Sequence, residues 1–373
     1  MIVKFHDYTL GYRIVSFAKS KLAAEDLLDS GIEVIYFENN GLTLLPENVM
    51  LTVNVNDIEK LSHCSNYDVF EVSDNGNAYL YYNTQSADNA FLLSLKCNSN
   101  CIMCPVAENV RKTGHIANSQ SLIKIASQIP IDAQHLTLTG GEPFLMGEGV
   151  FDFFEYLKGK FTHSDFLLLT NGRAFCSASF ANRTRQTLPS NTIIGIPIHG
   201  HNAELHDHIT QVKGSFDQTC KGIKNMLNLG CRIELRIVVS KLNYMHINEI
   251  ADLIINEFPT TDCVKFMGLE MLGNAAKHCD DVWLPYPQAF NSSERAIDKL
   301  ILNGIDVGIY NFPMCSVPSR YWGIYQKSIS DYKIRYAANC DLCAMKNDCG
   351  GIFGGTIRLA KDDVIPFLEE KRC

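Results

Sequence analysis

The feature that most constrains the fold of this chain is an alternation of short apolar runs with amphipathic stretches between Phe91 and Met271. The apolar runs are as long as buried strands, and the stretches between them carry apolar residues at helical spacing. This alternation is typical of parallel strands joined by right-handed helical crossovers. Six units favour a partial (β/α)6 barrel over the closed eight-unit form. The six expected strands are Phe91–Lys96, His135–Thr139, Phe166–Thr170, Thr192–Ile198, Arg232–Ser240 and Cys263–Glu270.

Local signals predict where two of the intervening helices begin and end. Asn118 or Ser119 is a suitable N-cap for one helix, and Ser215 is a suitable N-cap for another. Gly230 is expected to end this second helix, because glycine readily adopts the left-handed conformation that follows a helix C-terminus.

The segments on either side of the alternating region differ from it. The N-terminal part shows alternating, strand-like segments and a predicted hairpin turn at Asp74-Asn75-Gly76, which indicates a small β-rich domain. The polar stretch Asn83–Asn89 suits a linker. After Met271 the alternation is expected to end, and a helical stretch at Ser292–Leu302 leads to a second group of cysteines. We therefore expect an α/β chain with three regions, 1–88, 89–280 and 281–373.

The composition excludes several classes of partner. A net charge of −8 without long runs of one sign argues against nucleic-acid binding. The first residues lack the pattern of a signal peptide, and no apolar run approaches the ~18 residues of a membrane span. We therefore expect a cytoplasmic protein with neither a nucleic-acid nor a membrane partner.

The 14 cysteines are expected to be reduced thiols, because the cytosol disfavours disulfides. Clustered thiols then indicate metal ligands, and seven of them fall into two groups. The scattered remainder are expected to be small buried apolar residues: Cys64, Cys176, Cys220, Cys231, Cys263, Cys279 and Cys373.

The first group, Cys97, Cys101 and Cys104, directly follows the first expected strand. Its thiols should gather at the carboxyl edge of the parallel strands, where active sites of such folds lie. Soft thiolates select zinc, Cu(I) or iron–sulfur clusters, and a structural zinc site would need a fourth ligand. A cubane held by only three thiolates leaves one iron open to a substrate or cofactor.

The spacing C-x3-C-x2-C after a first strand resembles the signature of the radical S-adenosylmethionine (SAM) superfamily. The run Gly140-Gly141-Glu142-Pro143 after the second strand resembles that family's SAM-binding motif, in which glycines allow the methionine amino group to approach. A zinc-binding structural loop is the alternative for this region.

The same resemblance implies further SAM contacts. Met103 stands where the family has an apolar residue against the adenine, and Thr170, Asn171 and Arg236 match positions near the ribose or carboxylate. The alternative for Arg236 is an ion pair inside the barrel.

The resemblance also implies a [4Fe-4S] cluster on the three cysteines, with SAM as the second cofactor. An external one-electron donor reduces the cluster, SAM is cleaved to a 5′-deoxyadenosyl radical, and the radical abstracts hydrogen from the substrate. The protein's task is then to position the substrate and exclude water. Few acid–base side chains are needed, so no catalytic side chain is assigned.

The second group comprises Cys315, Cys340, Cys343 and Cys349. It resembles the auxiliary-cluster region of the twitch and SPASM extensions of peptide-modifying radical SAM enzymes. Phe353 stands where the SPASM pattern has a further cysteine, which argues for one fully ligated auxiliary [4Fe-4S] cluster. Tetrahedral zinc is the alternative.

The segment His199–His208 contains four histidines, yet we do not expect it to bind a metal. His206-Asp207, followed by Gly214-Ser215-Phe216, resembles a non-metal pattern of radical SAM proteins. We expect this segment to line the mouth of the substrate site.

Three stretches, Phe266–Gly273, Ile309–Cys315 and Lys327–Tyr332, resemble the C component of the paired His-Xaa-Ser system maturases. This implies a precursor peptide as substrate and a second radical SAM protein as heterodimer partner. Two alternatives stay open. One is a small-molecule enzyme of the deazapurine-synthase type, and the other is a non-catalytic cluster-binding subunit. The N-terminal domain would dock the precursor or the partner, or serve only as a scaffold.

Overall fold

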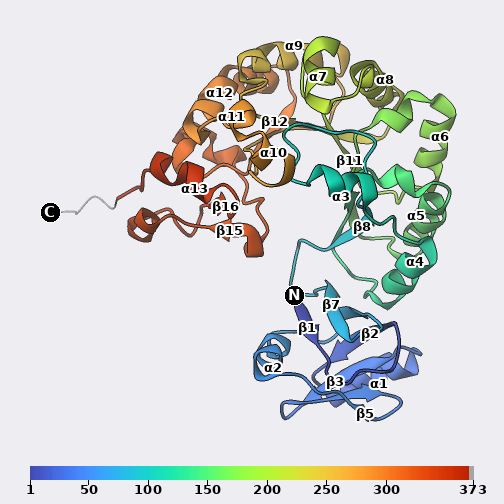
Figure 1. Ribbon diagram of the computed structural model, residues 1–373. Coiled ribbons are helices and arrows are strands. Elements are labelled where there is room, and N and C mark those ends of the chain that lie inside the picture. The colour runs from blue at the N-terminus through green and yellow to red at the C-terminus, as the bar shows by residue number, and fades with distance from the viewer. Residues whose placement is uncertain (369–373) are drawn as a thin grey trace.

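The computed structural model describes residues 1–368, and Cys373 lies outside the described residues. A large curved α/β domain stands above a smaller N-terminal domain, and the C-terminal segment lies beside the large domain (Figure 1). No helix in residues 1–368 has the length and apolar character to cross a bilayer.

The large domain is built on seven parallel strands in the order β14-β13-β12-β11-β10-β9-β8. Strands β8 and β14 are the two edges of this sheet and do not pair with each other, so the barrel is partial. The six strands expected from sequence are confirmed, with ends shifted by one to three residues. The strands are β8 (Ala90–Ser94), β9 (His135–Gly140), β10 (Asp165–Leu169), β11 (Thr192–Pro197), β12 (Arg232–Val238), β13 (Cys263–Met267) and β14 (Asp306–Tyr310).

The seventh strand corrects the expectation that the alternation ends after Met271. Strand β14 pairs in parallel with β13, with Val264 opposite Val307. The connection between them contains α10 (Gly273–Lys277), α11 (Cys279–Val282) and the long helix α12 (Tyr286–Leu302). The unit was missed because the connection between β13 and β14 is unusually long and holds three helices.

Helices cover the outer face of the sheet (Figure 1). Their inward faces bury large side chains, among them Phe153 and Phe154. Each such burial stabilises the fold by about 1.5–3 kcal/mol relative to exposure. The outer helices are α4 (Ser119–Gln128), α5 (Gly149–Lys160), α6 (Ala178–Thr187), α8 (Ser215–Asn228), α9 (Ile247–Glu257) and α12.

Helix ends follow local chemistry, with one correction. Asn118 caps α4, as predicted, by accepting from the backbone N–H groups of Gln120 and Ser121. Gly230, with a φ of +68°, follows α8 and ends it as predicted. The expected cap Ser215 is instead the first residue of α8. It leaves the capping position to Gly214 and donates its own hydroxyl to the Asp207 carboxylate.

The N-terminal domain holds a second seven-stranded sheet in the order β1-β7-β6-β2-β3-β4-β5. The predicted hairpin is confirmed, because β6 and β7 pair in antiparallel fashion around Gly76. Helix α4 of the barrel packs on this domain, and the Gln128 side chain donates to the Ile14 carbonyl at 2.7 Å. The elements are β1 (Ile2–Lys4), β2 (Arg13–Ala18), α1 (Lys21–Asp29), β3 (Val34–Glu38), β4 (Gly41–Leu45), β5 (Val49–Met50), α2 (Val55–Ser62), β6 (Val69–Val72) and β7 (Asn77–Tyr82).

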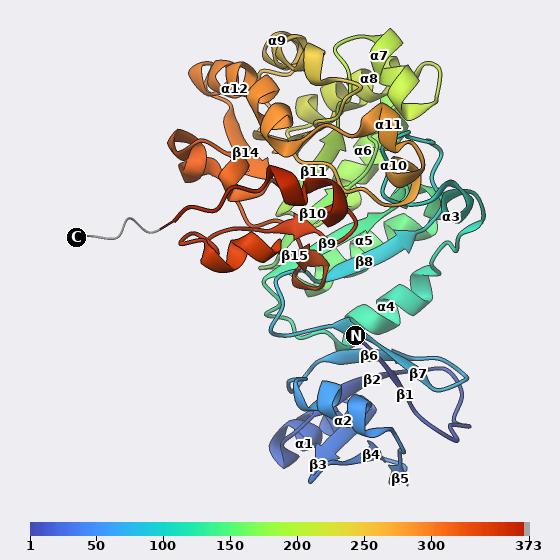
Figure 2. The same ribbon diagram turned by 60° about the vertical axis from the view of Figure 1, so that its left-hand side comes forward.

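The C-terminal region has little regular structure beyond the small hairpin of β15 (Ile334–Arg335) and β16 (Ile352–Phe353) and the short helix α13 (Ile357–Ala360). The view in Figure 2 shows this region beside the open face of the barrel. The buried Thr356 hydroxyl accepts from the Met271 N–H at 3.0 Å, which fixes the region to the segment after β13.

Candidate functional site

The three cysteines of the first group lie in the loop between β8 and α3 (Glu108–Thr113), at the carboxyl end of the first barrel strand. The backbone N–H of Ser99 donates to the Cys97 sulfur at 3.4 Å, and the N–H of Val106 donates to the Cys104 sulfur at the same distance. Hydrogen bonds of this kind stabilise thiolates and tune iron–sulfur clusters.

Burial governs the protonation of these thiols. It raises the pKa of Cys101 to about 12, with the neighbouring Cys104 and Cys97 contributing further. Burial likewise raises the pKa values of Cys97 and Cys104. A coordinating metal reverses this effect because its charge deprotonates the thiols outright.

Both cysteine groups offer only soft sulfur donors, which suits an iron–sulfur cluster. A cubane distributes its thiolates over different iron atoms, so its ligands lie farther apart than those of one ion. Across residues 1–368, no three His, Cys, Asp or Glu side chains are arranged to share a single metal ion.

The cysteine loop is held from two neighbouring elements. The carbonyl groups at the end of helix α7 (Ala203–Thr210) accept hydrogen bonds from backbone N–H groups of the loop. Asn100 N–H donates to Thr210 O at 3.0 Å, and Ile102 N–H donates to Ile209 O at 2.9 Å. The Asn171 side chain, beyond β10, donates to the Asn98 amide oxygen at 2.7 Å. The loop is thereby fixed to the carboxyl ends of the strands.

Gly140 and Gly141 end strand β9 against the backbone of β8. A Cβ on Gly140 would lie 2.2 Å from the Ser94 carbonyl oxygen, and one on Gly141 would lie 2.3 Å from that of Lys96. The Gly141 N–H donates to Ser94 O at 2.6 Å. The glycines are therefore required by strand-to-strand contact, which is a different reason from the approach of an amino group.

Glu142 lies buried between the ends of β9 and β10 and joins them. Its carboxylate accepts from the Thr170 hydroxyl at 2.8 Å, from the Asn171 N–H at 2.8 Å and from the Phe144 N–H at 3.2 Å. Burial raises the pKa of Glu142, although these hydrogen bonds act in the opposite direction. Pro143 is buried too and begins the 3-10 helix η1 (Pro143–Met146). The hydrogen bonds of Glu142 thus hold the loops that follow β9 and β10 together.

Met103 and Arg236 lie apart from each other. Met103 is buried in an apolar cluster with Ile209 and Met271, which anchors the cysteine loop. Arg236 donates to the Glu234 carboxylate at 2.6 Å on the same strand, which is the ion pair that the sequence left open. Its side chain also lines a cavity.

This barrel cavity has a volume of about 590 Å³, within the size range of ligand sites. It runs from the first residues of β8 and β9 to Pro105 of the cysteine loop, and Phe353 of the C-terminal region also lines it. Its charged lining residues are Asp88, Arg236, Glu270, Lys327 and Lys333.

The four cysteines of the second group line one small, largely apolar pocket in the C-terminal region. The backbone N–H groups of Met314 and Gly351 each donate to the Cys349 sulfur at 3.3 Å. Burial raises the pKa of Cys315 to about 11, and the pKa of Cys340 is also raised by burial. The structure thus brings together residues that are 34 positions apart, from Cys315 to Cys349.

The histidine segment does not join the barrel cavity. His201, His208 and His246 line a separate surface pocket, which shares no residue with that cavity. Asp207 accepts from the N–H groups of Gly214 and Phe216 at 2.5 and 2.8 Å, so it serves the start of helix α8.

Sequence reasoning missed Glu234, the partner of Arg236, and three polar residues around the cysteine loop: Arg111, Arg173 and Asn274. Arg173 donates to the Asn98 carbonyl at 2.9 Å, and Asn274 donates to the Cys101 carbonyl at 3.2 Å. No spacing pattern marks them, because their partners come from segments distant in the sequence.

A partial parallel barrel with a three-thiol loop at the end of its first strand defines a class of α/β fold that offers soft metal ligands at the carboxyl edge of its sheet. A comparison with known families matches part of this barrel. Residues 91–254 match the model described as the Radical SAM superfamily. The matched region spans 164 of the 373 residues and includes the cysteine loop.

Two curated relatives match the same region. The antilisterial bacteriocin subtilosin biosynthesis protein AlbA of Bacillus subtilis (strain 168) is 29% identical over 166 residues, 44% of this chain and 36% of the relative. The AdoMet-dependent heme synthase of Methanosarcina barkeri (strain Fusaro / DSM 804) is 27% identical over 165 residues, 44% of this chain and 46% of the relative. The chain thus spans less than half the length of these relatives.

Among solved structures, the Streptococcus suis protein SuiB gives a TM-score of 0.49 at 14% identity, covering 67% of this chain and 55% of SuiB. The protein anSMEcpe with bound AdoMet gives a TM-score of 0.48 at 17% identity, covering 59% of this chain and 63% of anSMEcpe.

Proposed function

We propose that this chain is a peptide-modifying radical SAM enzyme that acts on a ribosomally made precursor. The observation that carries the proposal is the barrel cavity, which reaches the loop bearing Cys97, Cys101 and Cys104 at Pro105. A substrate in that cavity would lie next to an iron–sulfur cluster held by the loop.

Cys97, Cys101 and Cys104 would hold a [4Fe-4S] cluster and leave one iron for SAM. The bound pair supplies reductive cleavage of SAM and a 5′-deoxyadenosyl radical that abstracts hydrogen. The chain contributes position: the hydrogen bonds of Ser99 and Val106 orient two of the sulfurs, and the packing of Met103 fixes the loop.

SAM would be bound where the strands end. The run from Gly140 to Pro143 and the pair Thr170 and Asn171 form this edge, where Glu142 keeps the two loops in register. Arg236 would approach the ligand from the barrel cavity that it lines, with its charge partly balanced by Glu234.

Cys315, Cys340, Cys343 and Cys349 would hold an auxiliary [4Fe-4S] cluster. With all four thiolates in one pocket, such a cluster has no open iron and suits electron transfer. Zinc is the competing occupant, and metal analysis of the purified chain separates the two.

A peptide substrate is supported by a path that continues beyond the barrel. A second groove, of about 850 Å³, lies between the N-terminal domain and the barrel. It shares the lining residues Ala87 and His135 with the barrel cavity. An extended chain can occupy two successive cavities, which a compact ligand cannot do. Similarity to a bacteriocin biosynthesis protein points in the same direction.

This path gives a direct test. Ala87→Trp should obstruct the junction of the two cavities and reduce modification of the peptide, while SAM cleavage in the absence of peptide continues. Ala178→Trp, on the exposed start of α6, is the matched control. Unchanged peptide modification in Ala87→Trp would show that the path is not used.

The resemblance to the His-Xaa-Ser maturases narrows the proposal. The precursor would carry His-Xaa-Ser repeats, a second radical SAM protein would be the heterodimer partner, and an external one-electron reductant would serve both. The location would be cytoplasmic, where free thiols stay reduced. Co-expression of the three components, followed by mass spectrometry of the peptide, tests this narrower proposal.

The main experiment is anaerobic reconstitution with iron and sulfide, reduction in the presence of SAM, and measurement of 5′-deoxyadenosine. Wild type should produce it, and the Cys97→Ala/Cys101→Ala/Cys104→Ala variant should not. Cys176→Ala controls for the loss of a thiol elsewhere. Absence of product from wild type, with the cluster intact and the partner supplied, would favour a non-catalytic subunit.

A small-molecule substrate is the second candidate function. It is favoured by the similarity to two relatives described as a heme synthase and an Fe-coproporphyrin III synthase. Under this alternative a small molecule would be turned over without any peptide, and Ala87→Trp would leave that turnover unchanged.

A further inference from the structure

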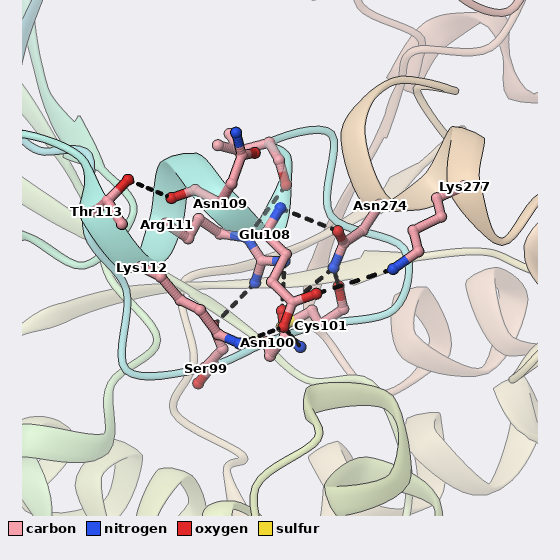
Figure 3. Close-up of polar contacts among 11 residues, drawn as sticks. Ser99, Asn100, Cys101, Glu108, Asn109, Arg111, Lys112, Thr113, Asn274 and Lys277 are labelled. Atoms are coloured by element: carbon pink, nitrogen blue, oxygen red, sulfur yellow. Dashed lines mark hydrogen bonds and ion pairs between the residues drawn. The ribbon is translucent and has the colours of Figure 1, made fainter.

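Arg111, in helix α3, is a buried cation whose side-chain hydrogen bonds all go to the cysteine loop. The residue is only 3% exposed. Its guanidinium donates to Ser99 O at 2.9 Å, to Val106 O at 3.1 Å and to the Asn100 amide oxygen at 2.7 Å (Figure 3). Its own carbonyl accepts from the Cys97 N–H at 3.1 Å. Arg111 thus holds the loop on both sides of Cys101.

All three side-chain acceptors of Arg111 are uncharged, which is unusual for a buried guanidinium. Glu108 is the acidic residue on the same helix, but its carboxylate pairs with Lys112 at 2.6 Å and with Lys277 at 3.9 Å (Figure 3). In residues 1–368 no carboxylate lies within ion-pair distance of Arg111. Burying a charge without a counter-charge is costly, so an anionic group is expected next to it.

Since Glu108 is engaged by two lysines, the groups of the cysteine loop that can become anionic beside Arg111 are the three thiols. Each of the three side-chain hydrogen-bond partners of Arg111 lies within two positions of one of these cysteines in the sequence.

We propose that Arg111 is a positioning residue that supplies the counter-charge for the thiolate-held cluster and makes that cluster easier to reduce. The inference rests on the proposed function, because it assumes a cluster on this loop. One-electron reduction adds one negative charge to the cluster, with the electron coming from a low-potential donor such as dithionite. A fixed positive charge favours the more negative state.

The test is the reduction potential of the cluster in the full chain, measured by a dithionite titration that follows the electron paramagnetic resonance signal. Only the signal that changes on addition of SAM is used, because a fully ligated auxiliary cluster has no open iron. Arg111→Gln removes the charge, and Arg111→Lys keeps it while losing the fork of hydrogen bonds.

Asn274→Ala is the matched control for loosening the loop. Asn274 is buried, and its amide donates to Cys101 O at 3.2 Å and to the Asn100 amide oxygen at 3.3 Å. It therefore binds the same loop with a similar number of hydrogen bonds and without charge. Iron content and cluster absorbance are measured first for every variant.

We expect Arg111→Gln to shift the reduction equilibrium about tenfold toward the oxidised cluster, which is about 59 mV for one electron. Arg111→Lys keeps the charge, so its reduction potential should stay close to that of wild type. Asn274→Ala should show no shift. Equal shifts of the reduction potential in Arg111→Gln and Asn274→Ala would overturn the inference. The absence of any shift in Arg111→Gln would overturn it too. Failure of wild type to load a cluster would instead contradict the proposed function.

Discussion

Gly141→Ala offers a test of why glycine stands at the end of β9. The added Cβ would lie 2.3 Å from the Lys96 carbonyl oxygen, 2.7 Å from the Lys96 carbonyl carbon and 2.8 Å from the Leu95 carbonyl oxygen. All three atoms belong to the backbone, so no side-chain rotation relieves the contact. The strand end must move away from the segment that leads into Cys97.

The free-energy cost can be estimated from what this movement breaks. Overpacking costs about 1–3 kcal/mol. The hydrogen bonds from Gly141 N–H to Ser94 O and from Glu142 N–H to Lys96 O would also weaken, at about 1 kcal/mol each. The free energy of unfolding should therefore fall by about 3–5 kcal/mol.

The assay is urea unfolding of the chain without iron or SAM, followed by circular dichroism. Gly159→Ala is the matched control, because Gly159 lies exposed in α5 and its added Cβ meets nothing within 4 Å. This control should gain about 0.5–1 kcal/mol, since alanine favours a helix over glycine.

The result that would refute the reasoning is a Gly141→Ala variant that unfolds like wild type in the absence of SAM yet binds SAM weakly. Glycine would then be needed for the approach of the ligand, as its resemblance to the SAM-binding motif suggests. A loss of stability in the cofactor-free chain supports strand contact instead.

Three further predictions concern titration and metal content. Asp207 is half-buried, and its partial desolvation raises its pKa, but hydrogen bonds from Phe216, Gly214 and Ser215 outweigh this and lower the pKa. Asp207→Asn should therefore cost about 2 kcal/mol at neutral pH, and in urea titrations this difference should shrink as the pH falls through the folded pKa. The pKa of Glu142 is raised by burial, so its stabilising contribution is present below the ordinary glutamate pKa and lost as the pH rises. The stability of wild type relative to Glu142→Gln should therefore decrease as the pH rises from the ordinary glutamate pKa through the raised folded pKa, and a constant difference would contradict the assignment. Cys340→Ser should remove about half of the iron bound per chain if the second group holds a [4Fe-4S] cluster, whereas loss of zinc with unchanged iron would indicate the alternative.

Local patterns predicted much of the fold. Each barrel strand is a compact apolar run, and side chains that are buried on both faces require such a run whatever its partners are. Asn118 and Gly230 act within one or two turns of their own helix. Short-range features of this kind can be read from the sequence because the interacting residues are sequence neighbours.

Other features depended on how the chain returns to itself. Strand β14 was recognised as a barrel strand only through its pairing with β13 across a long connection. Ser215 lost the capping role to Gly214 because the Asp207 carboxylate, from the preceding helix, already satisfies that helix start. Crossover length and competition between distant groups leave no periodic signal in the sequence.

The candidate site shows the same division. By itself, the sequence indicated two groups of thiols as candidate ligands and the edge of the sheet on which the first group lies, because cysteine spacing and strand order are local properties. Only the tertiary structure decided that Glu142 joins the ends of β9 and β10, and that the backbone just after β8 requires a glycine at position 141. It also decided that Arg111 and Asn274, 163 positions apart, bind the same loop. The physical reason is that hydrogen bonds and charges act over a few ångströms of space, and only the folded barrel sets which residues lie that close.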